Sequence, residues 1–198
     1  KMVVKLFGVW DTNDVEVRDP GLKAYINLKP VYIPHSGGRH VKSFGKADMH
    51  IVERLINRVT VTGHEGKKHK RTSGRNTGKK HMTYAIVREA LDMVEKTTKK
   101  NPVQVLVDAL TNAAPREETT RIKYGGTAYH QSVDVAPMRR LTVALRFITI
   151  GAAKAAFRTK KSMPQSLAEE IMGAANYDLK CYSISKKEEL ERIAKAAR

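Results

Sequence analysis

Residues 121–131 read Arg121-Ile122-Lys123-Tyr124-Gly125-Gly126-Thr127-Ala128-Tyr129-His130-Gln131. The pattern predicts two short β-strands, because a Gly-Gly pair tolerates the positive φ angles that a two-residue hairpin turn requires. Pro115 and Pro137 bound the segment, so we expect a β-hairpin arm at about residues 116–135. A two-stranded ribbon on its own is marginally stable in water. The arm should therefore fold back on its own protein or lie against another molecule.

The sequence outside the arm has the periodicity of amphipathic helices. The expected helices run over about 47–59, over about 78–99, from the cap Asn101-Pro102 to just before Pro115, from Pro137 to about 159, and from Pro164 to about 175. For the last helix, Ser185-Lys186-Lys187-Glu188 reads as a capping box, with Leu190, Ile193 and Ala197 facing inward. The patterns predict a mainly α fold: a bundle of about six helices with an inserted, protruding β-hairpin arm.

Residues 1–45 have a different pattern. The segment from Lys5 to Trp10 is a candidate short strand, and after it Pro20, Pro30 and Pro34 lie at a spacing that should forbid a helix. Apolar residues between the prolines predict an extended strap lying on a surface rather than a free tail. We therefore expect an extended N-terminal extension over residues 1–45 and a helical domain over residues 46–198.

The charge of the chain points to a polyanionic partner. Lys and Arg number 37 against 20 Asp and Glu, which gives a formal net charge of +17, and the pI is near 10.0. Such a balance favours nucleic acid over an anionic membrane. We expect no signal peptide and no transmembrane span, because Arg146 and Lys154 interrupt the longest apolar stretch. The single Cys181 excludes an internal disulfide, fits a reducing compartment and is expected to be a buried, inert thiol.

Three groups of residues are candidates for contact with a polyanion. The first lies in the loop 63–81, where Glu65 is the only acid among Lys67, Lys68, Lys70, Arg71, Arg75, Lys79 and Lys80. The second is a stripe along the helix after Pro137, formed by Arg139, Arg140, Arg146, Lys154 and Arg158. The third is the arm itself, with Arg121, Lys123, Tyr124, Gly125, Gly126, Tyr129 and His130. Phosphate contact releases condensed counterions and so favours such clusters of cations.

Each group also has a purely structural interpretation. The loop could be an ordinary solvated surface, although so many like charges repel one another. The aliphatic parts of the Arg and Lys side chains in the stripe could instead pack over Val143, Phe147 and Ile150. In the arm, Tyr124 and Tyr129 could stack on bases or could form ordinary cross-strand pairs, and the sequence leaves both open.

Enzymatic and metal-binding functions have little support in the sequence. The segment from Gly74 to Lys80 is one residue too short between its glycines for a nucleotide-binding P-loop, and Lys80 stands where a Ser or Thr should be. Cys181 has no cysteine partner at zinc-ligand spacing. No acid pair or nucleophile–base set stands out. We expect no catalytic residues, no metal, no cofactor and no small-molecule substrate.

Several motifs occur in an order that resembles a known family. They are Gly78-Lys79-Lys80, Asn101-Pro102-Val103-Gln104-Val105, Pro115-Arg116-Glu117-Glu118, Tyr124-Gly125-Gly126-Thr127-Ala128-Tyr129, Val133-Asp134-Val135-Ala136-Pro137-Met138-Arg139-Arg140 and Ala144-Leu145-Arg146. Over about residues 45–198 the chain resembles the small-subunit ribosomal protein family numbered seven in bacteria and five in eukaryotes. The N-terminal strap and the long loop before Gly78 resemble the archaeal and eukaryotic branch.

The resemblance implies a structural protein of the cytoplasmic ribosome that binds the 3′ major domain of small-subunit rRNA and helps to nucleate head assembly. It implies that Lys79, Lys80, Arg139, Arg140 and Arg146 face rRNA, next to neighbouring head proteins. The arm would lie near messenger RNA and exit-site tRNA. The alternative is an architectural DNA-binding protein, because basic β-arms on helical bodies also embrace DNA. The Gly-Gly tip offers no apolar wedge of the kind such arms insert between bases.

Overall fold

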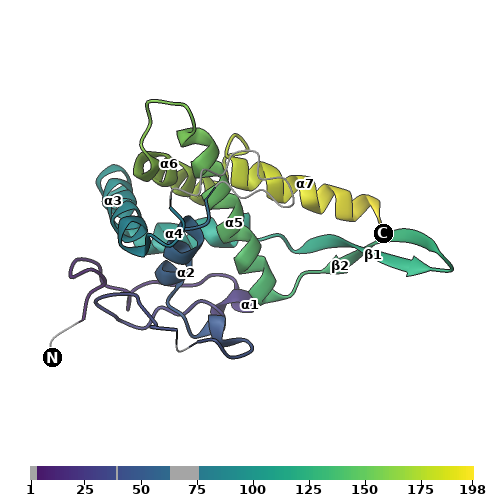
Figure 1. The fold of residues 1–198 in the computed structure, drawn as a ribbon, viewed down its shortest axis with the longest axis horizontal. Helices are drawn as coiled ribbons and strands as arrows, with labels where there is room; N and C mark the ends of the chain where they lie inside the picture. The colour runs from purple at the N-terminus through teal and green to yellow at the C-terminus, as the bar shows by residue number, and fades with distance from the viewer. Residues whose placement is uncertain (1–3, 39, 63–75) are drawn as a thin grey trace.

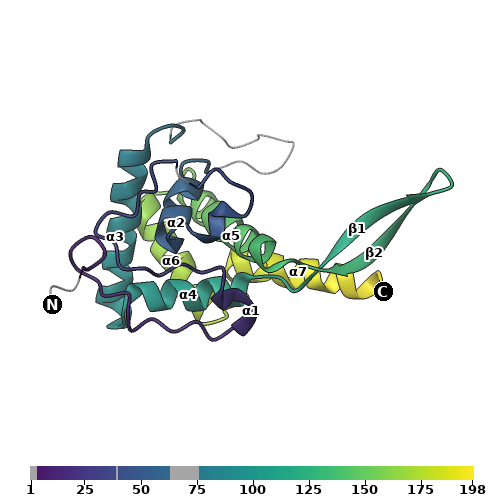
Figure 2. The same cartoon turned by 90° about the horizontal axis from the view of Figure 1, so that it is seen from below.

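The computed structural model describes residues 4–38, 40–62 and 76–198. These residues form α1 (Pro20–Lys23), a 3₁₀ turn (Gly45–Ala47), α2 (Ile51–Val59), α3 (Lys80–Thr98), α4 (Pro102–Ala113), β1 (Glu117–Tyr124), β2 (Thr127–Asp134), α5 (Pro137–Ala156), α6 (Met163–Ala175) and α7 (Tyr182–Ala196). The helices pack as a bundle and the hairpin projects from it (Figures 1 and 2). The structure thus confirms a mainly α fold with an inserted β-arm.

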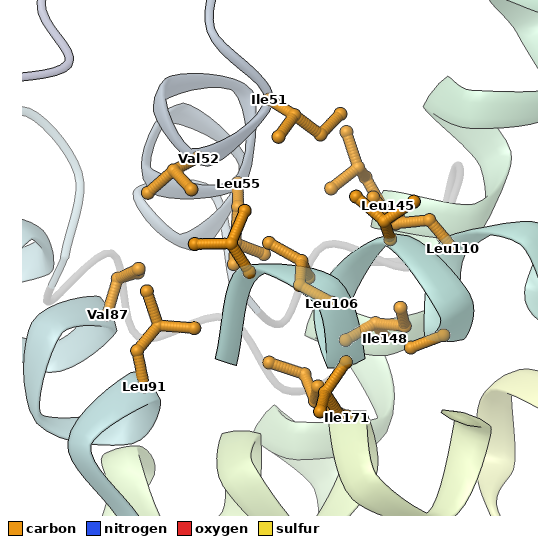
Figure 3. Close-up of a cluster of buried hydrophobic side chains, with 14 of the residues drawn as sticks. Ile51, Val52, Leu55, Val87, Leu91, Leu106, Leu110, Leu145, Ile148 and Ile171 are labelled. Carbon is orange, nitrogen blue, oxygen red and sulfur yellow. The ribbon is translucent and has the colours of Figure 1, made fainter. Parts of the chain in front are cut away.

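The core lies where α2, α4, α5 and α6 meet. Leu55, Leu106, Ile148 and Ile171, one from each of these helices, are completely buried (Figure 3). Helix α6 packs against α3, α4 and α5, so its apolar face is covered on several sides. Burial of a side chain of this size stabilises the folded state by about 1.5–3 kcal/mol. The core therefore gives α5, which bears the predicted basic stripe, a fixed position.

Local capping explains where two of the central helices begin. The Asn101 side chain accepts a hydrogen bond from the Val103 N–H at 3.0 Å, and Pro102 occupies the first helical position. This is the cap that the sequence predicts. At the start of α6, the Ser162 side chain accepts a hydrogen bond from the Gln165 N–H.

The N-terminal segment is less extended than predicted. Residues from Lys5 to Trp10 form a tight turn with one isolated bridge, not a strand, because Phe7 and Gly8 both adopt positive φ angles. The expectation that the prolines exclude a helix is also wrong. Pro20 is the first residue of α1, where proline has no hydrogen bond to lose. Leu22 of this helix is completely buried and belongs to the main core cluster.

Helix α7 begins three residues before the predicted capping box. Cys181 is its N-cap residue, and the Ser185 N–H donates to the Cys181 carbonyl as in a helix interior. The predicted inward face is also wrong in part, because Ile193 is 47% exposed and its neighbour Ala194 is buried instead. The prediction was wrong because tertiary packing of Ile184, which is fully buried, extends the helix past the local capping signal.

Candidate nucleic-acid interface

The arm has a braced base and a free tip. Strands β1 and β2 pair in the register Arg121↔His130 and Ile122↔Tyr129, and Gly125 and Gly126 turn with φ of 55° and 82°. Helix α7 packs beside the base of the hairpin, and both views show the tip projecting beyond it (Figures 1 and 2). The predicted turn and strands are confirmed.

Contacts from the body explain the orientation of the base. The Ser132 N–H donates to the Ala197 carbonyl at 3.2 Å, and the Arg116 N–H donates to Glu191 Oε1 at 2.8 Å. Arg198 forms an ion pair with Glu117. The last turn of α7 and the residues after it therefore hold the lower half of the arm.

Beyond this base, the arm exposes its side chains on both faces. Tyr124 is 80% exposed and Tyr129 is 58% exposed. Tyr129 lies opposite Ile122, as in an ordinary cross-strand pair, whereas Tyr124 lies opposite Thr127 near the turn. Arg121, Lys123 and His130 are exposed as well. The predicted arm residues thus lie together on a finger whose upper half is available to another molecule.

The two arginines at the root of the arm point to different carboxylates. Arg139 makes a two-pronged contact with Glu118, with Nε–Oε1 and Nη2–Oε2 distances of 2.6 and 3.0 Å. Arg140 Nη2 donates to Asp19 Oδ2 at 2.9 Å, and this pair joins α5 to the N-cap of α1. Burial acts to raise the pKa of Asp19, but hydrogen bonds from Arg140 and the Gly21 N–H outweigh it and the pKa is lowered. Both arginines therefore have compensated charges.

The basic stripe is shorter than the sequence predicts. Helix α5 ends at Ala156, and Arg158 follows in a left-handed conformation with φ of 56°. Arg158 therefore leaves the stripe, because the periodicity holds only within the helix. Arg146 is exposed on α5, and Lys154 Nζ lies 4.2 Å from the centroid of the Tyr182 ring of α7.

The predicted loop residues lie partly outside the described residues. The five that lie outside the described residues are Lys67, Lys68, Lys70, Arg71 and Arg75. Of the two that the structure describes, Lys79 is the exposed N-cap residue of α3. Lys80 approaches the buried Glu53 carboxylate of α2, with an Nζ–Oε1 distance of 3.4 Å.

A group of cations that the sequence did not single out lies between α2 and α5. Here Lys46, Arg54 and Arg58 line a cavity of about 190 Å³ with Thr142 and Leu145 of α5. Its remaining lining residues are Met49 and Asn57, so no acid lines it. We call this cavity the arginine pocket.

The charges in the arginine pocket lack carboxylate partners among the described residues. Arg54 is 7% exposed, and its guanidinium donates to the Tyr25 carbonyl and Thr142 Oγ1, at 3.3 and 3.4 Å. Arg58 Nε is also buried, and it has no hydrogen-bond partner among the described residues. Burial and then repulsion by Arg146 lower the pKa of Arg58. Arg146 of the predicted stripe is thus brought close to an arginine that the prediction missed.

A sequence signal for the pocket existed. Arg54 and Arg58 are four residues apart, so they share the polar face of the amphipathic helix that the sequence predicts there. The sequence did not indicate that this face lies against α5 instead of in open solvent.

The described residues also bear on metal binding, membrane spanning and the reactivity of Cys181. Those residues contain no group of three or more His, Cys, Asp or Glu side chains placed to hold a metal ion. No helix among them is long and apolar enough to cross a membrane. Burial, with the nearby Glu170 and Asp178 carboxylates, raises the pKa of the Cys181 thiol to about 11, so the thiol stays protonated and unreactive at neutral pH.

Comparison with known proteins identifies the family. The family model described as Ribosomal protein S7p/S5e matches residues 22–198. The small ribosomal subunit protein uS7 of Nanoarchaeum equitans is 52% identical over 198 residues, covering 100% of both chains. The protein of that name from Methanococcus maripaludis is 52% identical over 199 residues, again covering 100% of each. The chain therefore belongs to the ribosomal protein S7p/S5e family and is a structural, non-enzymatic component of the small ribosomal subunit.

Proposed function

We propose that this protein binds the 3′ major domain of small-subunit rRNA and helps to nucleate assembly of the head. The observation that carries the proposal is the arginine pocket, where Arg54 is 7% exposed and Arg58 is partly buried, with no carboxylate from the described residues beside them. A buried charge without a counter-charge costs several kcal/mol. An RNA phosphate would supply that counter-charge, and its oxygens match the forked donors of arginine.

The surrounding cations extend this surface. Arg146 is exposed beside the pocket and Lys79 at the start of α3. Arg139 keeps a side chain that is 59% exposed while it contacts Glu118, so it can reach a phosphate at the same time. We propose that these residues and the basic loop neutralise phosphates where rRNA segments converge, while residues 1–45 form an extension over the helical domain and help to contact neighbouring head proteins.

We further propose that the arm reaches messenger RNA and exit-site tRNA. In support, the upper half of the hairpin is exposed on both faces and carries cations together with tyrosines. Such side chains can contact phosphates and stack on unpaired bases. The brace from α7 would hold the finger at a constant angle to the body.

Salt dependence of binding tests the rRNA interface. Removing one phosphate contact should reduce the slope of log affinity against log salt by about 0.7–0.9. We therefore expect Arg58→Gln to lower affinity for a head-domain rRNA fragment. The slope should become shallower by about the amount expected for the loss of one phosphate contact. The control is Arg192→Gln, which removes the same charge from an exposed position on α7 beside Glu188 and Glu189. Equal slopes for Arg58→Gln and the wild-type protein would refute the assignment of the pocket.

A shortened arm tests the second part. Replacing residues 121–130 by a two-residue Gly-Gly turn retains the lower pairs, such as Thr119↔Ser132, and the Ser132 contact to α7. We expect normal affinity for the head-domain fragment but faster loss of exit-site tRNA from assembled subunits. A shortened arm that abolishes rRNA binding would show that the arm is part of the rRNA interface instead.

A further inference from the structure

One aromatic side chain in the N-terminal segment is exposed on a hydrogen-bonded turn. Phe44, just before the 3₁₀ turn, is 77% exposed, although burial would normally stabilise a side chain of this type. Its backbone has φ of 60°, a left-handed conformation that is unfavourable for a bulky residue. Strained conformations of this kind persist only where the surrounding structure enforces them, and they cluster at functional sites.

Contacts within the loop enforce the position of Phe44. The Gly45 N–H donates to the Lys42 carbonyl at 2.9 Å, and the Ala47 N–H donates to the Phe44 carbonyl at 3.0 Å. A Cβ added to Gly45 would lie 2.7 Å from the His40 carbonyl oxygen, so the chain passes very close to itself here. The ring is therefore presented from a tightly wound turn.

The charge around the ring selects the class of partner. Residues 40–47 contain His40, Lys42 and Lys46 and no acidic residue. Lys46, only two residues from Phe44, also lines the arginine pocket. An RNA strand with a phosphate in that pocket would thus lie close to the turn that bears Phe44. An apolar protein partner would gain nothing from the flanking cations.

We propose that Phe44 is a stacking platform for an unpaired RNA base, with the phosphates of the same strand contacting Lys46 and the arginine pocket. Aromatic side chains stack on unpaired bases with little dependence on sequence, because every base has a π face. The proposal rests on the proposed rRNA binding and deepens it, since it names unpaired nucleotides as the class recognised at this end of the interface.

Two RNA probes separate stacking from phosphate contact. One is a single-stranded oligoadenylate, and the other is an abasic oligonucleotide of equal length with the same phosphates. We expect Phe44→Ala to weaken binding of oligoadenylate at least about fivefold, the lower end of base–aromatic stacking, and to leave the abasic probe unchanged. The salt slope should not change, because no phosphate contact is removed.

Two variants serve as controls. Tyr32→Ala removes another exposed aromatic of the same segment and should leave both affinities unchanged. Phe44→Trp should retain affinity and add an indole whose fluorescence falls as oligoadenylate binds. Trp10, the only native tryptophan, is 3% exposed and donates to Glu95, so its background signal should stay constant.

The outcomes distinguish the two proposals. If the wild-type protein binds neither probe nor the head-domain fragment, the proposed function is wrong. If it binds them and Phe44→Ala weakens both probes equally or neither, only the stacking platform is wrong. Normal RNA affinity in Phe44→Ala combined with loss of a neighbouring protein from assembled heads would identify a protein-docking surface and would also overturn the platform.

Discussion

Replacing Arg140 by alanine should destabilise the folded protein. The Arg140 side chain is 11% exposed and that of its partner Asp19 is 17% exposed, so the pair lies between a buried and a surface ion pair. Surface pairs contribute at most about 1 kcal/mol, whereas breaking a buried pair costs about 3–5 kcal/mol. A charged hydrogen bond contributes about 1.5–3 kcal/mol. We therefore expect Arg140→Ala to lower the free energy of unfolding by about 2–3 kcal/mol.

The double-mutant cycle isolates the pair. Urea unfolding of the wild-type protein, Arg140→Ala, Asp19→Ala and the double variant should give a coupling energy of about 1.5–3 kcal/mol. Asp19→Ala should also lose the hydrogen bond that caps α1. The control is Arg18→Ala, because the Arg18 side chain is 80% exposed and its Nε lies 3.9 Å from Asp108. Its cost should stay below about 0.5 kcal/mol.

The pH dependence gives an independent check on the same pair. Because the pKa of Asp19 is lowered in the folded state, the stability from the pair is present above the ordinary aspartate pKa. It is lost as the pH falls through the folded-state value. The difference between wild-type protein and Arg140→Ala should therefore be constant near neutral pH and shrink below about pH 4. A coupling energy below about 0.5 kcal/mol at pH 7 would refute the reasoning and leave Arg140 as a free RNA contact.

The packing of α6, α7 and the arm leads to three more predictions. Gly173→Ala should lower the free energy of unfolding in urea by about 1–3 kcal/mol, because the new Cβ would lie 2.0 Å from Cys181 Sγ. In a Cys181→Ala background the same substitution should be neutral or stabilising. An equal cost in both backgrounds would contradict the clash. Burial raises the pKa of Glu170, although hydrogen bonds oppose this shift. The Glu170→Gln variant should therefore gain stability relative to the wild-type protein as the pH rises from about 4 to 7. A stability difference that is constant with pH would refute this. Arg198→Ala should lower the free energy of unfolding by less than about 1 kcal/mol but should speed amide exchange at the base of the arm beside Glu117. Unchanged exchange would show that this ion pair does not brace the arm.

Local signals were sufficient for most of the architecture. The Asn101-Pro102 cap, the Gly125-Gly126 turn and the apolar periodicity of the central helices each depend on residues a few positions apart, and the structure bears them out. The beginning of α7 was wrong because a good local capping signal at Ser185 competes with packing of the helix start against the body. The one-turn helix at Pro20 was missed because proline disfavours a helix interior but not its first position.

The candidate interface also has a part that local sequence signals predict and a part that only tertiary packing decides. The sequence by itself determined that the chain carries an excess of cations, an arm with a Gly-Gly tip and a basic helix after it, because composition and periodicity are local properties. Only the tertiary structure decided which cations are compensated. Arg140 meets Asp19, 121 residues away in the chain, whereas Arg54 and Arg58 face α5 with no carboxylate from the described residues beside them. Whether a charge is paired depends on which distant side chains the packed helices bring within a few ångströms of it, and Coulomb interactions at that range are decided by the fold.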